Sequence, residues 1–208
     1  MLQTRALKYQ YPAGKPLSFP DIHFSNEDPA LILGESGCGK TTLLHLLAGL
    51  RTPSEGNVLL GDTSLYSLTT SERDAFRGKN IGVVFQTAHF IPSLTVLENI
   101  MMPLYLNGKV QDQNKAKAFL DRVNLFHKAF QPIGSLSVGE QQRIAIIRSI
   151  LHEPKWIFAD EPTSALDNKN AEQVIGLFME MTQTVNAQLI VVTHDNRWDG
   201  IIDNTVRL

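Results

Sequence analysis

Residues 34–41 have the most evident chemistry in this sequence, because they read GESGCGKT and fit the pattern G-x-x-x-x-G-K-[ST]. They follow the apolar run Ala30–Leu33 and precede a helix-like segment, TTLLHLLAGL. In such a phosphate loop, backbone N–H groups and a helix N-terminus point at phosphate oxygens, and glycines let the backbone come close. We expect Lys40 to reach the β- and γ-phosphates of a nucleotide and the Thr41 hydroxyl to ligate Mg²⁺. The residues predicted to contact the nucleotide are Gly34, Glu35, Ser36, Gly37, Cys38, Gly39, Lys40, Thr41 and Thr42.

Two acidic residues, Asp160 and Glu161, follow the apolar run WIFA. Such a run predicts a buried strand, and open α/β sheets bind ligands at the carboxyl ends of their strands. We expect Asp160 to hold Mg²⁺, directly or through water, and Glu161 to polarise a water molecule for in-line attack on the γ-phosphate. Without the phosphate loop, the pair would be interpreted more simply as an acidic start of a helix.

His194 and Gln86 each follow a further apolar run, QLIVVT and NIGVVF, so both should reach the same edge of the sheet. A lone histidine after a strand is usually a loop or core residue, but one aimed at a phosphate site is a catalytic candidate. We expect His194 to position the attacking water together with Glu161. The Gln86 amide could ligate Mg²⁺ and order water, and movement of its loop would couple the nucleotide state to something outside the core.

Strand-like and helix-like segments alternate along the chain, which predicts an α/β fold with a mostly parallel sheet. The N-terminal part reads as short strands, RALKYQY and LSFPDIHFS, with partial alternation of apolar residues. Three helical segments, VLENIMMPLYL, NKAKAFLDRVNL and GEQQRIAIIRSIL, follow one another, and NAEQVIGLFMEMTQTV predicts a further amphipathic helix. We therefore expect a single domain with a core of about residues 1–88 and 152–208 and a helical insertion of about residues 89–151.

The composition excludes several classes of protein. The 208 residues are 43% hydrophobic and 19% charged, an ordinary globular balance that suits one substantial core. The net charge of −2 is not the footprint of a nucleic-acid binder, so we expect no nucleic-acid partner. The single cysteine, Cys38, excludes an internal disulfide and fits a reducing compartment. The sequence has neither a signal-peptide pattern nor the ~18 consecutive apolar residues of a spanning helix, so we expect a soluble chain that reaches a membrane only through a partner.

Residues 136–140, LSVGE, followed by QQRIAIIRSIL, resemble the signature motif of the ATP-binding cassette ATPases, the nucleotide-binding subunits of ABC transporters. By itself LSVGE also reads as an ordinary helix start, with Ser137 as N-cap and Glu140 completing a capping box, and the two interpretations are compatible. Further motifs of the family are matched in order over almost the whole chain. They are Tyr11 as a candidate for stacking on adenine, the phosphate loop, Gln86, the signature, Asp160 with Glu161, the segment SALD ending at Asp167, and His194.

The resemblance implies a P-loop NTPase core with an N-terminal antiparallel β subdomain and an inserted helical subdomain. It also implies a head-to-tail homodimer, in which ATP and Mg²⁺ lie between the phosphate loop of one copy and the signature of the other. Ser137, Gly139 and Glu140 would then lie against the nucleotide, and Asp167 would communicate across the interface. An integral membrane permease is the second implied partner, and it would hold the chain on the cytoplasmic face of the inner (plasma) membrane.

Within the family, FQTAHFIPSLTVLENIMMPL and ADEPTSALD look most like the lipoprotein-releasing and macrolide-export type, with a permease docking on the helix around Val96–Leu106. The sequence departs from the family pattern at Val138, which stands where a glycine is usual. A β-branched residue resists positive φ and adds bulk near the phosphate. The chain also ends at TVRL, where similar proteins usually continue to another short strand.

Three alternatives compete with this interpretation. A cassette ATPase that drives a non-transport membrane complex, in cell division or the envelope, would carry the same motifs. A DNA-repair or chromosome-organising ATPase would need long coiled coils between the two halves of the site, and no sustained heptads occur between Lys40 and Asp160. A binding-only module with a dead site is disfavoured, because Lys40, Asp160, Glu161 and His194 are all present.

Overall fold

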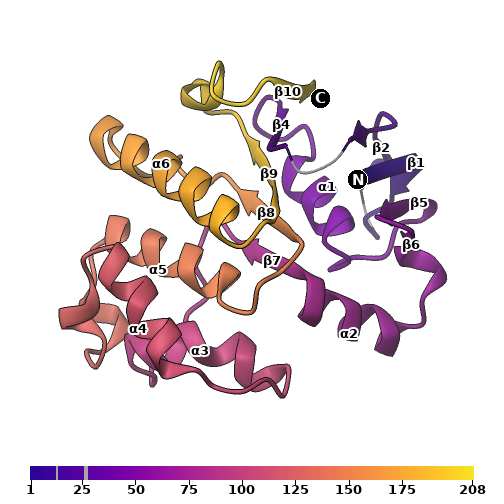
Figure 1. The fold of residues 1–208 in the computed structure, drawn as a ribbon. Helices are drawn as coiled ribbons and strands as arrows, with labels where there is room; N and C mark the ends of the chain where they lie inside the picture. Colours follow the sequence, from indigo (N-terminus) through magenta and orange to yellow (C-terminus); the bar gives the residue numbers. More distant parts are fainter. Residues whose placement is uncertain (13, 26–27) are drawn as a thin grey trace.

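The computed structural model describes residues 1–12, 14–25 and 28–208, which form two β-sheets with helices packed against them (Figure 1). The first sheet is parallel and has the strand order β10-β4-β9-β8-β7. Its strands are β4 (Ala30–Leu33), β7 (Ile81–Val84), β8 (Trp156–Asp160), β9 (Gln188–Thr193) and β10 (Asn204–Arg207). The predicted α/β fold with a mostly parallel sheet is therefore confirmed.

Side chains of the parallel sheet alternate between two buried hydrophobic clusters, one on each face. Leu31, Leu33 and Ile157 belong to the cluster that contains the buried side chains of helices α5 and α6. Ile32 and Phe158 belong to the cluster that contains helix α1 and the second sheet. A sheet that is covered on both faces needs strands that are apolar throughout, which explains the uninterrupted apolar runs in the sequence.

The second sheet is antiparallel and is formed mainly by the N-terminal part of the chain. Strand β1 (Leu2–Tyr9) pairs with β2 (Leu17–Ser18), β3 (His23–Phe24) and β5 (Glu55–Leu60), and β5 also pairs with β6 (Thr63–Ser64). The segment LSFPDIHFS forms only the short strands β2 and β3, because Pro20 between them has no N–H for a ladder.

The helices are α1 (Lys40–Leu47), α2 (Thr70–Asn80), α3 (Val96–Leu106), α4 (Gln113–Arg122), α5 (Val138–Ile150) and α6 (Asn168–Thr184). Helices α3, α4 and α5 gather on the side of the parallel sheet opposite to β1 and β5 (Figure 1). The sequence pattern did not indicate α2, which is mostly polar and contacts β7. None of the helices in the described part of the chain combines the length and the apolar character needed to cross a bilayer.

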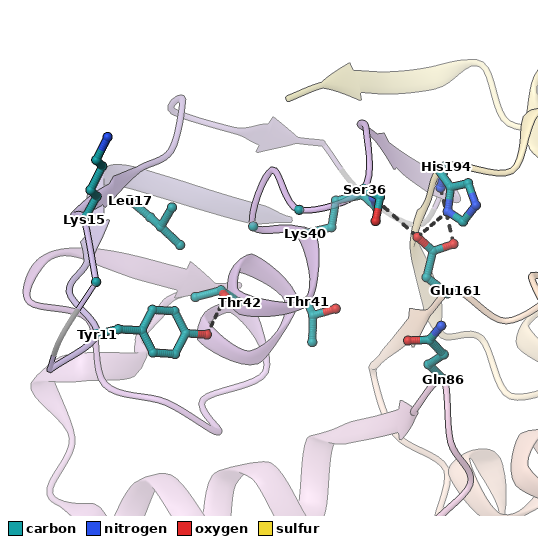
Figure 2. Close-up of a pocket in the computed structure, with 13 residues that line it drawn as sticks. Tyr11, Lys15, Leu17, Ser36, Lys40, Thr41, Thr42, Gln86, Glu161 and His194 are labelled. Atoms are coloured by element: carbon teal, nitrogen blue, oxygen red, sulfur yellow. Dashed lines mark hydrogen bonds and ion pairs between the residues drawn. The ribbon is translucent and has the colours of Figure 1, made fainter.

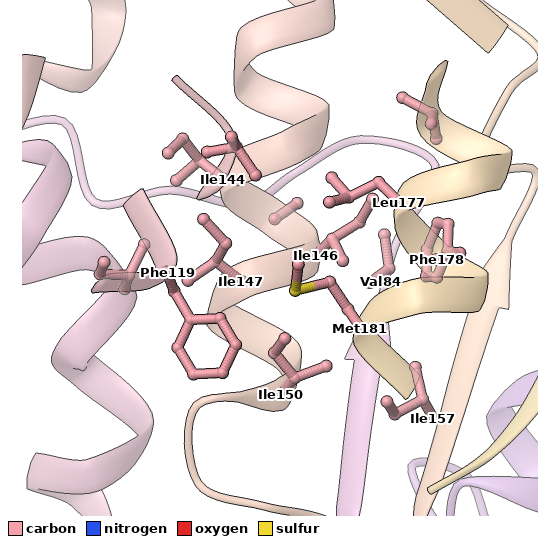
Figure 3. Packing of buried hydrophobic residues seen from close by; sticks show 14 of the residues in the cluster. Val84, Phe119, Ile144, Ile146, Ile147, Ile150, Ile157, Leu177, Phe178 and Met181 are labelled. Carbon is pink, nitrogen blue, oxygen red and sulfur yellow. The ribbon is translucent and has the colours of Figure 1, made fainter. Parts of the chain in front are cut away.

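Helix α5 packs against helices α3, α4 and α6 and against strand β7. Its residues Ile144, Ile147 and Ile150 are fully buried in one cluster with Phe119 of α4 and Phe178 of α6 (Figure 3). The helix predicted for GEQQRIAIIRSIL is therefore confirmed, and it shares a hydrophobic core with the parallel sheet.

The contact between α5 and strand β7 depends on Gly82. A Cβ atom at this position would collide with the backbone carbonyl oxygen of Ser149, near the end of α5. A glycine is therefore required where the helix backbone crosses the strand.

Candidate active site

A cavity of about 540 Å³ lies where the carboxyl ends of the parallel strands meet the start of α1 (Figure 2). The cavity is lined by the phosphate loop from Ser36 onward, by the segment around Tyr11, and by Gln86, Glu161 and His194. The phosphate loop, Gln86, Glu161 and His194 thus meet at one edge of the parallel sheet, as strand order dictates, and the segment around Tyr11 reaches the cavity from the second sheet.

The phosphate loop leads directly from β4 into α1. Gly37 and Gly39 have positive φ values of 84° and 100°, which only glycine adopts without strain, and Gly39 is the N-cap residue of α1. The loop is also tight, because a Cβ at Gly34 would lie 2.7 Å from Sγ of Cys38. Gly34, Glu35 and Cys38 shape the loop from behind and, among the described residues, are not part of the cavity lining.

Lys40 is buried, and its ammonium group lies inside the loop. Its Nζ donates to the backbone carbonyls of Gly34 and Glu35, both at 2.9 Å, and lies 3.4 Å from Oε1 of Glu161. The three interactions place the positive charge between the phosphate loop and the carboxylate that follows β8.

Glu161 is held by four contacts on a backbone with a φ of +48°. Its Oε2 accepts hydrogen bonds from Oγ1 of Thr193 (2.6 Å) and from the backbone N–H of His194 (3.3 Å). Its Oε1 lies 2.8 Å from Nδ1 of His194 and also contacts Lys40. Burial alone would raise the pKa of Glu161, but the hydrogen bonds from His194 and Thr193 outweigh burial and lower it. The carboxylate is therefore ionised and has a fixed orientation.

Asp160 lies deeper than its neighbour and is only 3% exposed. Among the described residues nothing donates a hydrogen bond to its Oδ1, which is fully buried. Burial raises the pKa of Asp160, although the Thr41 side chain and the charge of Lys40 act in the opposite direction. A buried carboxylate oxygen without a donor is suited to a cation. Thr41 and Gln86 line the cavity, whereas Asp160 is not among the described residues that line it.

Tyr11 lies at the opposite end of the cavity from Glu161 and His194 (Figure 2). Its hydroxyl lies 2.8 Å from Oγ1 of Thr42, and Tyr9 packs edge-on against its ring with 4.8 Å between the centroids. The Arg51 guanidinium lies 5.3 Å from the centre of the Tyr11 ring. Tyr11 is thus fixed from behind, in the place where a planar base could stack on it.

The signature segment (residues 136–140) lies outside this cavity, since none of its residues is among the described residues that line it. Ser137 is the N-cap of α5, and its hydroxyl accepts a hydrogen bond from the backbone N–H of Glu140. Val138 is the first residue of α5, with a helical backbone and a side chain that is 62% exposed. The resistance of valine to positive φ therefore has no effect at this position, because the backbone of Val138 is helical. Asp167, which caps α6, is also exposed.

Several residues of the site were not anticipated from the sequence. Thr193 orients Glu161, and its position at the end of a buried apolar run, next to His194, was an available signal. Lys15 and Leu17 line the cavity beside Tyr11. Arg51, which follows the C-terminal end of α1, packs against the ring of Tyr11. Nothing in the local sequence pattern marks these three, because they reach the site only through the pairing of β1 and β2 and the turn after α1.

Known proteins are similar to this chain over its whole length. The sequence profile of the ABC transporter family matches residues 21–164. The chain is 36% identical to the lipoprotein-releasing system ATP-binding protein LolD of Shewanella oneidensis, over 100% of this chain and 93% of the relative. It is 41% identical to LolD of Legionella pneumophila (strain Paris), over 85% of this chain and 79% of the relative.

Solved structures show the same relationship. The dimeric ATP-binding cassette MJ0796, in a post-hydrolysis state with ADP and Pi, superposes with a TM-score of 0.90 at 30% identity, over 100% of this chain and 94% of that one. The cbiO1 subunit of the ABC transporter complex cbiONQ from Clostridium perfringens gives a TM-score of 0.85 at 27% identity, over 99% of this chain and 83% of that one. The chain therefore belongs to the ABC transporter family, as a subunit that binds and hydrolyses ATP.

Proposed function

We propose that this chain powers a lipoprotein-releasing type of ABC system, as a head-to-tail homodimer that closes on ATP. The observation that carries the proposal is the separation of the two predicted phosphate-binding elements. The phosphate loop lines the cavity, whereas Ser137 caps an exposed helix start outside it. A second copy could bring its own Ser137 to the γ-phosphate, so that each site is complete only in the dimer. The dimeric state of the MJ0796 cassette and the LolD relatives favour this arrangement.

The residues around Asp160 fit a magnesium ion. Asp160, Thr41 and Gln86 offer a carboxylate, a hydroxyl and an amide oxygen, the oxygen donors that Mg²⁺ prefers. The ion would supply charge neutralisation at the β- and γ-phosphates. The buried Oδ1 of Asp160, which accepts no hydrogen bond among the described residues, is the observation that supports this assignment.

Glu161 and His194 are proposed to act on the attacking water. The ionised carboxylate of Glu161 can accept a proton from water, and His194, which lines the cavity, lies against the same carboxylate with about half of its side chain exposed. Thr193 fixes the orientation of Glu161 and is therefore a positioning residue. Lys40 lies close enough to exchange its contacts with the loop carbonyls for phosphate oxygens.

We propose a membrane permease as the second partner, docked on the helical insertion of about residues 89–151. A groove of about 500 Å³ lies between α2, β7, α3 and α5, and it includes the apolar side chains of Phe85, Met102 and Leu106. Leu106 and its neighbour Tyr105 are 73% and 65% exposed. Exposed apolar side chains at the rim of a groove favour docking of a partner helix, and such a permease would place this chain at the membrane surface.

The substitution Glu161→Gln tests the dimer and the catalytic assignment together. The variant should bind Mg²⁺-ATP and form dimers, and its hydrolysis rate should fall by about 10²-fold or more, because the amide cannot accept the proton. Light scattering coupled to size exclusion measures the mass, and phosphate release measures the turnover. The control Lys40→Ala should lose ATP affinity and remain monomeric. A Glu161→Gln chain that stays monomeric at saturating Mg²⁺-ATP, even with its permease, would contradict the proposal.

A further inference from the structure

The N-terminus of α5 carries a partly buried ion pair that the signature motif alone does not predict. Oε2 of Glu140 accepts hydrogen bonds from the backbone N–H of Ser137 at 2.8 Å and from its hydroxyl at 3.0 Å. The other oxygen, Oε1, lies 2.6 Å from Nζ of Lys128. The side chains of Lys128 and Glu140 are only 22% and 17% exposed.

Two other helices of this chain begin with the same capping box, and they serve as internal comparisons. Thr69 with Glu72 starts α2, and Thr95 with Glu98 starts α3. In the α3 box the hydroxyl and backbone N–H donate to the glutamate at 2.7 and 2.8 Å, much as in α5. Within residues 1–12, 14–25 and 28–208, neither of these two exposed glutamates pairs with a cation. Helix capping therefore does not require the lysine.

The difference matters because α5 is the helix whose start is proposed to meet a triphosphate. Hydrogen bonds from Lys128 and from the Ser137 backbone lower the pKa of Glu140 to about 2, so its carboxylate is charged at any working pH. A carboxylate in hydrogen-bond contact with the Ser137 hydroxyl would repel a phosphate that approaches the same hydroxyl, and partial burial weakens the screening of that repulsion. The charge also offsets the positive end of the helix dipole, which would otherwise attract the phosphate.

We propose that Lys128 is a positioning residue for ATP-driven dimer closure, because it neutralises Glu140 and so allows the signature serine to receive the γ-phosphate. This inference rests on the proposed ATP-sandwich dimer. The Ser137 hydroxyl turns from Oε2 of Glu140 to the phosphate, while Lys128 keeps the carboxylate in place through Oε1.

Lys128 is placed for this role by backbone outside α5. It ends the short 3₁₀ helix Phe126–Lys128, and its N–H donates to the carbonyl of Leu125 at 2.9 Å. The lysine therefore approaches the capping box from a separate, ordered segment and need not move when Ser137 changes its partner. A homodimer contains two such boxes. The loss of the ion pair therefore weakens both nucleotide sites and contributes twice to the free energy of dimer closure.

The test uses the full chain with Glu161→Gln as parent, so that hydrolysis does not reopen the dimer. The ATP concentration for half-dimerisation is measured by sedimentation velocity at low and high salt. Lys128→Met should raise it by about tenfold or more at low salt and by less at high salt, because the unpaired carboxylate repels phosphate. Adding Glu140→Gln to Lys128→Met should restore the parent value, because the charge is then gone.

Two controls separate this effect from folding and from nucleotide binding. Lys115→Met removes a similar ion pair, with Glu153, away from the start of α5 and should leave dimerisation unchanged. Binding of a fluorescent ATP analogue to the monomeric Lys128→Met chain should match the parent, since the phosphate loop is untouched. A parent that never dimerises would refute the proposed function. A parent that dimerises while Lys128→Met dimerises equally well, or a double variant as defective as Lys128→Met, would overturn the role of Lys128.

Discussion

Asp160 and Glu161 are neighbours whose surroundings shift their pKa values in opposite directions. Burial raises the pKa of Asp160, whereas hydrogen bonds from His194 and Thr193 overcome burial and lower the pKa of Glu161. Environments that separate two carboxyl groups in this way commonly separate their roles. The protein itself keeps Glu161 in its ionised form. For Asp160, a bound cation would offset the burial that raises its pKa and would favour the ionised form.

His152 gives a prediction about stability and pH. It is 4% exposed, its Nε2 donates to the carbonyl of Ile81 at 3.1 Å, and burial lowers its pKa to about 4. The unfolded chain protonates this histidine near pH 6.5 and the folded chain does not, so stability is lost as pH falls from about 6.5 toward 4. Between pH 7 and 5 we expect the free energy of unfolding to fall by about 2 kcal/mol through this residue alone.

Urea unfolding at pH 7 and pH 5 checks this expectation. His152→Gln keeps a side-chain N–H donor but cannot titrate, so its stability should depend less on pH than that of the wild type. The exposed His127 provides the control, and His127→Gln should keep the wild-type dependence. Equal pH dependence in the wild type and His152→Gln would show that this histidine is not buried in its neutral form.

At the scale of elements, helices α2, α3 and α5 begin with the same type of capping box, so the effects of removing their N-cap residues can be compared. Ser137→Ala and Thr95→Ala each remove an N-cap and should each lower the free energy of unfolding by about 1 kcal/mol. Only Ser137→Ala also removes the proposed phosphate donor, so only this variant, in the Glu161→Gln parent, should need about tenfold more ATP to dimerise. Urea unfolding and sedimentation velocity measure the two effects, and equal dimerisation of both variants would remove Ser137 from the nucleotide site.

The elements also show why part of the fold was predictable. Strands β4, β8 and β9 are uninterrupted apolar runs and α5 and α6 have strong apolar faces, so periodicity found them. Helix α2 was missed because its only large apolar side chain is the half-buried Phe76, although Thr69 and Glu72 signalled its start. In the site, the strand-end rule brought Glu161, His194 and Gln86 together. The support of Tyr11 by Arg51 depends on tertiary packing, which no local pattern encodes.

At the scale of the whole molecule, the groove between α2, β7, α3 and α5 is expected to receive the permease. Leu106→Asp places a charge at its apolar rim and should strongly reduce copurification with permease subunits, because burying an unpaired carboxylate is costly. Val110→Asp is the control, since Val110 is 88% exposed and, among the described residues, is not part of the groove lining. Both variants should bind ATP normally. Retained copurification of Leu106→Asp would exclude this groove as the docking site.

The backbone of α5 at Ser149 lies so close to Gly82 of β7 that the C-terminal end of the helix is held against the sheet. This end is therefore the pivot about which the helix would tilt. Val138 begins the helix eleven residues away, which is a distance of about 16 Å at 1.5 Å rise per residue. A tilt of about 10° around the pivot would carry Ser137 sideways by about 3 Å, the length of one hydrogen bond. Such a tilt also moves the buried Ile144 and Ile147, so the helices packed against α5 must turn with it when the serine reaches or leaves a phosphate.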